Sequence, residues 1–358
     1  MKVIIAEKPS VGRELAKVFG ATTRKDGYIE GTGYSFTWAF GHLLQLAPPQ
    51  EYGFIGWRRQ HLPMLPAKFK LSIRKIKTKD GFVEDPGVRK QLDIIKKLFD
   101  EATEIIVATD AGREGELIFR YIYYFLKCKK PFKRLWISSQ TDEAIKDGFR
   151  NLKPGTDYDT LFNSAHARSQ SDWLVGMNAT QALSLSAGNK TVLSLGRVQT
   201  PTLAMICARF LENKNFVPQI YYQIAIQLDK DGQLFKAISV ANYKTQTEAQ
   251  EVFDKVEDVT SGNATGGNIT AVEAKPRKEP PPLLHDLSSL QQEANKKNGF
   301  TADQTLNLLQ NLYESKLVSY PRTGSRYIGD DIFATVPQLI TSLLEHPIFA
   351  NQATFLQT

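Results

Sequence analysis

The first 150 residues alternate short apolar runs with amphipathic stretches. Runs at 2–6, 104–108 and 134–138 have the length and continuous apolar character of buried parallel strands. Residues 28–40 alternate apolar and polar positions around Thr32-Gly33, which predicts a hairpin. The alternation of strand and helix predicts a parallel α/β sheet with helices on both faces. The predicted helices span 10–19, capped by Ser10, then 88–99, 116–127 and a stretch from Thr141.

The remaining residues change pattern twice. Residues 156–212 are helical in character, whereas alternation from Tyr221 onward predicts strands at 221–228, 233–240 and 269–274, with a helix at 247–256. The proline-rich segment 275–282 predicts a linker, and helices at 286–297 and 301–315 follow it. A chain of 358 residues with these shifts predicts several domains, α/β first and then α-helical and strand-rich (α+β).

Charge and cysteine content narrow the function classes. Lys and Arg outnumber Asp and Glu by 45 to 38, a net charge of +7 that favours a polyanionic partner. The two cysteines, Cys128 and Cys207, form no CxxC pair, which argues against disulfides and cysteine-based zinc sites. The N-terminal run is too short for a signal peptide, and no stretch has the length of a spanning helix. We therefore expect a soluble protein, cytoplasmic or nucleoid-associated, with no membrane partner.

Acidic residues gather where two predicted strands end. Glu7 follows the first strand, and Asp110 and Glu114 follow the strand at 104–108. Because parallel strands present their carboxyl ends at one edge, these acids are expected to face one crevice. Clustered carboxylates suit Mg²⁺, which keeps several waters and takes one or two of them. The alternative is that the acids only favour helix N-termini electrostatically.

Several other chemistries are absent from the sequence. Gly-Lys never occurs, so there is no P-loop, and Glu7-Lys8-Pro9-Ser10 stands where a dinucleotide fingerprint would begin. Neither HExxH nor GxSxG is present, and the five histidines lack metal-ligand spacing. No nucleotide cofactor is therefore expected.

One tyrosine has a context that suits nucleophilic attack. Tyr320 precedes Pro321 and Arg322, and an arginine at this spacing can grip a phosphate by a forked contact. A phenol with a pKa near 10 needs such cationic help to attack. The alternative is an aromatic residue that only packs.

Five motifs in this order resemble those of type IA DNA topoisomerases, most closely the topoisomerase III branch, over about residues 1–328. The motifs are Ala6-Glu7-Lys8-Pro9-Ser10, Thr109-Asp110-Ala-Gly-Arg113-Glu114-Gly-Glu116, Ala167-Arg168 to Asn178, Ser194-Leu-Gly196-Arg197-Val-Gln199-Thr-Pro201 and Ser319-Tyr320-Pro-Arg322-Thr323. The resemblance implies a Toprim domain (1–152), the first segment of a helical DNA-groove domain (153–214), a strand-rich arch segment (215–280) and the start of a tyrosine-bearing domain (281–358). Family members form a ring, which this chain would leave incomplete.

The resemblance also implies an activity. It is ATP-independent transient cleavage of single-stranded DNA through a 5′-phosphotyrosyl link, strand passage and religation, by a monomer. Tyr320 would be the nucleophile, Lys8 and Arg322 would hold the scissile phosphate, and Glu7 would be general acid, Mg²⁺ ligand or both. Asp110 and Glu114 would complete the metal site. The implied DNA-binding residues are His61, Arg168, Asp172, Trp173, Gln181, Ser194, Leu195, Gly196, Arg197, Val198, Gln199 and Arg322.

The sequence departs from the family pattern at three positions. Gly112 replaces the second acid of the metal motif, which predicts a single, weakly held Mg²⁺; Gly324 replaces an acid after the tyrosine motif, and Gln181 replaces an arginine. Relatives also continue well past residue 358, so we expect a truncated chain. Two alternatives stay open: a fragment that binds single-stranded DNA without turnover, and another Toprim enzyme, a nuclease or primase.

Overall fold

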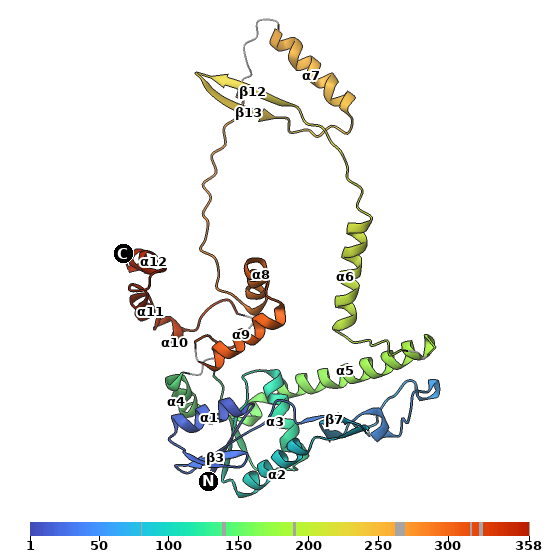
Figure 1. Ribbon diagram of the computed structural model, residues 1–358, viewed down its shortest axis with the longest axis vertical. Helices are drawn as coiled ribbons and strands as arrows, with labels where there is room; N and C mark the ends of the chain where they lie inside the picture. The colour runs from blue at the N-terminus through green and yellow to red at the C-terminus, as the bar shows by residue number, and fades with distance from the viewer. Residues whose placement is uncertain are drawn as a thin grey trace. The chain divides into compact units, whose positions relative to one another are not determined.

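The computed structural model describes residues 1–79, 81–137, 141–188, 191–261, 269–315, 317–321 and 325–357 (Figure 1). Internal contacts divide the chain into two units. One comprises Met1–Gln199 and Pro282–Thr358, and the other comprises Thr200–Pro281. Arg322, Thr323 and Gly324 lie outside the described residues.

A mixed sheet forms the centre of the first unit. The described strands, in spatial order, are β11 (Lys153–Pro154), β10 (Phe132–Arg134), β9 (Glu104–Ala108), β1 (Lys2–Ala6), β4 (Tyr34–Trp38), β3 (Tyr28–Gly31) and β2 (Thr23–Lys25).

The middle four strands, β10, β9, β1 and β4, run parallel as predicted, but both edges are antiparallel. The hairpin between β3 and β4 explains one edge. Thr32 and Gly33 both have positive φ, 52° and 84°, which is the geometry of a tight turn joining antiparallel neighbours. At the other edge, the short β11 returns antiparallel to β10.

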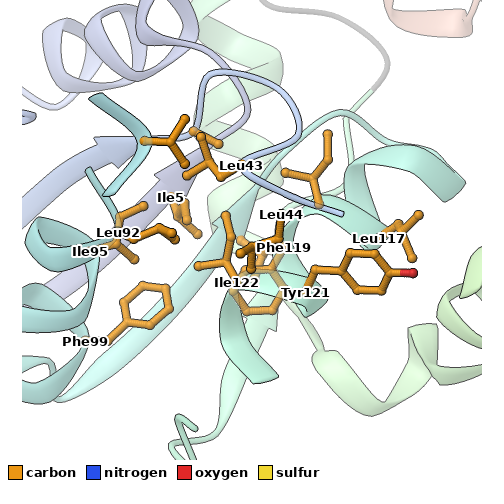
Figure 2. Packing of buried hydrophobic residues seen from close by; sticks show 14 of the residues in the cluster. Ile5, Leu43, Leu44, Leu92, Ile95, Phe99, Leu117, Phe119, Tyr121 and Ile122 are labelled. Atoms are coloured by element: carbon orange, nitrogen blue, oxygen red, sulfur yellow. The ribbon is translucent and has the colours of Figure 1, made fainter. Parts of the chain in front are cut away.

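Alternate side chains of the central strands pack into two cores. Val3, Ile5 and Ile105 belong to the core under α2 (Pro86–Glu101) and α3 (Arg113–Phe125), shown from close by in Figure 2. Ile4 and Ile106 belong to the second core. That core lies under α1 (Pro9–Val18) and α4 (Asp142–Arg150). The prediction of helices on both faces is therefore confirmed, since each strand buries both of its sides.

Helix starts differ from the predictions in two places. Ser10 does not cap α1: the helix begins at Pro9, whose ring fixes φ for the first turn, and Lys8 is the N-cap. α3 begins at Arg113, three residues before the predicted start, and includes Glu114 in its first turn. Asp85 caps α2 and Thr141 caps α4 through their side chains.

The third predicted strand is wrong in its extent. β10 ends at Arg134, where the prediction had the strand begin, and Ser138 lies outside the described residues. The side chain of Arg134 is fully buried. A buried guanidinium needs polar partners around it, and backbone carbonyls just beyond the end of β9 provide them.

Arg134 is the centre of a buried polar network. Its guanidinium donates to the carbonyls of Val107 (3.1 Å), Thr109 (2.8 Å) and Asp110 (2.7 Å). Its Nε lies 3.1 Å from Glu116 Oε2, and the other Glu116 oxygen accepts from Arg120 Nε at 2.8 Å. The network ties the end of β9 to α3.

The rest of the first unit is largely helical. α5 (Asp159–Ser186) packs on α3 and is the longest described helix. The predicted helices at 286–297 and 301–315 are confirmed as α8 and α9, each begun by a capping box. The other elements are β5 (Leu44–Leu46), η1 (Pro49–Tyr52), η2 (Arg59–His61), β6 (Leu71–Ile73), β7 (Lys75–Thr78), β8 (Gly81–Glu84), η3 (Gly155–Tyr158), α8 (Leu287–Asn298), α9 (Ala302–Glu314), α10 (Asp330–Phe333), α11 (Val336–Leu343) and α12 (Ala350–Gln357).

The second unit contains a hairpin between helices. α6 (Gln199–Lys214), which starts at the junction, leads into β12 (Ala225–Lys230) and β13 (Gln233–Ile238), and α7 (Gln246–Ser261) follows. The strand predicted at 269–274 is wrong: these residues are irregular and find no strand to pair with in the described chain. Within the described ranges, no helix is long and apolar enough to cross a membrane.

Glu116→Gln should destabilise the first unit by about 3 kcal/mol, because two buried guanidinium groups lose their shared carboxylate. Urea unfolding followed by circular dichroism would measure the change. Asp147→Asn is the matched control, since it removes an exposed ion pair with Arg150 and should change stability by less than about 0.5 kcal/mol. Equal unfolding midpoints for the two variants would contradict the assignment.

Candidate functional site

The parallel register brings two acids to one edge of the sheet. Ala6 of β1 pairs with Ala108 of β9, so the residues that follow both strands leave the sheet side by side. The backbone N–H of Asp110 donates to Glu7 Oε2 at 3.1 Å. The predicted meeting of Glu7 and Asp110 therefore occurs in the structure.

Gly115 allows this arrangement. A Cβ at residue 115 would lie 2.2 Å from the Asp110 carbonyl oxygen, so only glycine lets the first turn of α3 approach this closely. The Thr109 hydroxyl donates to the Gly115 carbonyl at 2.8 Å and fixes the same turn. By contrast, a Cβ at Gly112 would meet open space, so the departure at this position is not required by packing.

The environment of Glu7 favours its protonated form. Burial, and then the charge of Asp110, raise the pKa of Glu7 to about 7, against the opposing effects of the Asp110 N–H, Lys8 and Arg134. The second carboxylate is also unusual, because Asp110 Oδ2 is buried without a hydrogen-bond partner. A buried oxygen of this kind needs a cation or a donor that the protein does not itself supply.

These two carboxylates fit a weakly held Mg²⁺. Magnesium takes one or two carboxylates and keeps its other positions for water or phosphate oxygens. Glu114, the third predicted ligand, lies elsewhere in the same cleft, 3.6 Å from His42 Nε2 and 3.8 Å from Arg168 Nη1. Accordingly, no cluster of three or more acidic, histidine or cysteine ligands is found in the described part of the chain.

Tyr320 shares a cleft with the acids. The cleft has a volume of about 1110 Å³, and its lining includes Glu7, Asp110, Glu114, Arg168 and Tyr320. The Tyr320 ring meets that of Tyr313 edge to face, with centroids 5.4 Å apart. Lys8 lies beside Glu7 as the N-cap of α1, whereas Arg322 lies outside the described residues.

Ion pairs continue from this cleft along α5. Asp172 lies 2.7 Å from Arg197 Nε and 3.9 Å from Arg168 Nε. The loop before α6 is held to the helix by Thr180, whose hydroxyl accepts from Leu195 N at 2.9 Å. Ser194 accepts from Gln199 at 2.8 Å, and Gly196 and the exposed Val198 lie between them in sequence. The loop residues predicted to bind DNA therefore form one ordered surface.

Two predicted DNA-binding residues are buried. Trp173 is 6% exposed, and its indole N–H donates to the Ala47 carbonyl at 2.9 Å. Its ring packs against Tyr52 and Phe69, so it offers no face to a base. Gln181 is 4% exposed and donates to the Arg58 carbonyl at 3.2 Å.

The loop that covers Gln181 is a surface that the sequence prediction largely missed. Asn178 anchors this loop through the backbone of Met64, at 2.6 and 3.0 Å. Trp57, Arg58 and Arg59 are exposed on it, beside His61, whose Nδ1 lies 3.2 Å from the Gly56 carbonyl. An aromatic residue followed directly by two arginines is a pattern that could have identified the loop from the sequence.

Comparisons with known proteins agree with these features. The Toprim domain family matches residues 2–140, and the DNA topoisomerase family matches residues 156–357. The DNA topoisomerase 3 of Bacillus thuringiensis (strain Al Hakam) is 45% identical over 369 residues, which cover 98% of this chain and 48% of that protein. For the DNA topoisomerase 3 of Shouchella clausii (strain KSM-K16), the identity is 42% over 354 residues, 97% of this chain and 46% of the relative. The chain thus spans about half the length of the curated relatives it matches.

The fold is also similar to a solved structure. Full-length topoisomerase I from Thermotoga maritima superposes with a TM-score of 0.63 at 24% identity, over 95% of this chain and 52% of that one. At this identity the likeness concerns the fold alone. The predicted fold class is confirmed: a Toprim α/β domain, with a mixed sheet, joined to a helical region.

The raised pKa of Glu7 gives a test in metal-free protein. Protonated Glu7 stabilises the fold fully below about pH 4.5, and this contribution is lost as the pH rises through about 7. Glu7→Gln mimics the protonated form, so it should be more stable than wild type by about 3 kcal/mol at pH 8 and equal to it near pH 4. Thermal unfolding in EDTA measures this, with the exposed Glu101→Gln as control. Parallel pH profiles for wild type and Glu7→Gln would contradict the prediction.

Proposed function

The chain belongs to the type IA DNA topoisomerase family, and we propose that it cleaves and reseals single-stranded DNA with Tyr320 as the nucleophile. The observation that carries this proposal is the single cleft lined by Tyr320, Glu7 and Asp110. Three groups surround one space there: Tyr320 as nucleophile, Glu7 as a carboxyl group that favours its protonated form, and Asp110 as a carboxylate with an unused oxygen. Phosphoryl transfer to a protein hydroxyl requires such an arrangement.

The reaction exchanges one phosphodiester for another. The Tyr320 oxygen attacks phosphorus and loses its proton to solvent, while the bond from phosphorus to the 3′-oxygen of the neighbouring nucleotide breaks. Glu7, which a pKa of about 7 leaves about half protonated at neutral pH, donates its proton to that leaving oxygen. Attack by the 3′-hydroxyl reverses each step and releases Tyr320. Because bond energy is conserved in the phosphotyrosyl link, no ATP is needed.

Positive charge would hold the scissile phosphate in place. Lys8 lies next to Glu7 in the chain, and Arg322 follows Tyr320 by two residues. We assign both to the phosphate, where they stabilise charge that develops in the transition state. Asp110 and Glu7 are the carboxylates that would hold Mg²⁺, and Glu114 lines another part of the same cleft. When bound, the metal ion would supply further positive charge to the phosphate oxygens.

The strand would approach along α5. Arg168 and Arg197 lie on this path, and both can exchange the carboxylate of Asp172 for a DNA phosphate. The loop with Trp57, Arg58 and Arg59 would extend the path, with Trp57 providing the stacking face that Trp173 lacks. Strand passage, relaxation and decatenation are further parts of this proposal, in which the described cleft would supply the cleavage chemistry.

A labelled single-stranded oligonucleotide tests the chemistry. Incubation with Mg²⁺ followed by denaturation should leave a covalent adduct on wild-type protein, and none on Tyr320→Phe, because the ring is kept and the attacking oxygen is lost. Tyr327→Phe is the matched control: Tyr327 is 74% exposed, lies seven residues on and should leave the adduct yield unchanged.

The other outcomes separate the alternatives. Binding without adduct would reduce the chain to a single-strand-binding module. An adduct on Tyr320→Phe would disprove the nucleophile. Cut DNA with no protein-linked product would favour a Toprim nuclease.

Trp57→Ala should weaken binding of the oligonucleotide about fivefold or more, because one stacked base is lost. The melting temperature should fall only slightly, since Trp57 is 37% exposed. Trp173→Ala should lower the melting temperature much more, because it removes a ring that is only 6% exposed. Fluorescence anisotropy in fixed salt and differential scanning fluorimetry measure the two effects. Unchanged affinity in Trp57→Ala would exclude this loop from the DNA path.

A further inference from the structure

A second, smaller cavity opens on Tyr320. It has a volume of about 160 Å³ and shares Tyr320, Asp110 and Ala111 with the larger cleft. It extends between α1, the end of β9 and the residues that follow β10. A group held in it would therefore lie directly beside a phosphate bound to the tyrosine.

The lining of this cavity suits a flat, neutral group. Trp136, Ile137, Val11 and Tyr313 provide aromatic and apolar walls. The described lining contains no lysine or arginine, and it includes the carboxylates of Glu14 and Asp110. Unlike the larger cleft, which Arg113 and Arg168 also line, the small cavity therefore offers a phosphate no cationic side chain, whereas an aromatic ring with amino groups at its edge would be accepted.

The walls are also rigid. Trp136 is stacked on Tyr158, with centroids 4.9 Å apart and planes at 25°, and the Arg134 guanidinium lies 5.3 Å from its ring centre. Arg134 itself is fixed by its buried network, and Leu135 donates to the Val107 carbonyl at 2.9 Å. A preorganised aromatic wall loses little entropy when a ring packs against it.

We propose that this cavity binds the nucleobase next to the scissile phosphate, on the nucleotide whose 5′-phosphate becomes linked to Tyr320. The assignment rests on the proposed function and deepens it. Arg168 and Tyr320 both line the larger cleft, and Tyr320 alone of these two also lines the small cavity. A strand that enters from Arg168 and passes Tyr320 would therefore bring its next nucleotide to the small cavity. The small cavity lies at this position and shares its wall with the nucleophile.

An abasic scan tests the assignment. Tyr320→Phe protein, which keeps the aromatic ring, is titrated with oligonucleotides that each lack one base. Loss of the base just 3′ of the mapped cleavage site should weaken binding about fivefold, and loss of its neighbours on the 3′ side should have a smaller effect. In the double variant with Trp136→Ala, the abasic penalty at that position should disappear. Phe82→Ala, an exposed aromatic outside both cavities, is the control and should preserve the penalty.

A second variant keeps the test decisive if Trp136→Ala unfolds. Val11→Phe fills the cavity from α1 and should remove the same positional penalty while far-UV dichroism stays native. A flat abasic profile, or a penalty that survives both variants, would overturn the assignment. Failure of wild type to form an adduct would instead overturn the proposed chemistry. Without a mapped cleavage site, the scan would then remove the base at every position in turn. A loss of affinity at one position that disappears in Trp136→Ala would still support the base site.

Discussion

The buried guanidinium of Arg134 is the interaction on which the candidate site depends. A charge with no exposed surface is stable in a protein only if its donors are satisfied, and here backbone carbonyls and Glu116 satisfy them. Those carbonyls belong to the end of β9 and the turn after it. The turn that presents Asp110 is thus held by the Arg134 side chain, which comes from β10. Removing this side chain would release both the turn and Asp110.

The same network explains the different properties of neighbouring acids. Glu116 is buried and paired with two arginines, so it is an anion with a structural role. Glu7 is buried next to another carboxylate, and it therefore holds its proton more tightly. Glu114 is half exposed and shared between His42 and Arg168. Acids from the first two motifs are thus separated by burial and by partner into three kinds of group.

The sequence was sufficient to predict the elements that are set by local periodicity and by turn residues. The central strands, the hairpin at Thr32-Gly33 and the caps of α8 and α9 follow from residues close in the chain. Prediction from the sequence failed where contacts between distant residues decide the structure. Arg134 is buried at the end of β10 by partners on α3 and just beyond β9, and residues 269–274 need a strand partner that the described residues lack. For the site, strand ends predicted the meeting of Glu7 and Asp110, but no local signal shows that Trp173 is covered by Tyr52 and Phe69.

The pairing of Asp172 with Arg197 has a consequence for how this surface would select a DNA strand. A strand that binds an arginine releases cations condensed on its own phosphates, which makes such binding depend on salt. Here the arginine is already paired with a carboxylate that is tethered to α5 and cannot diffuse away. A phosphate must therefore displace a competitor whose local concentration does not change with ionic strength. Chains whose phosphates match the spacing of the arginines would displace it best.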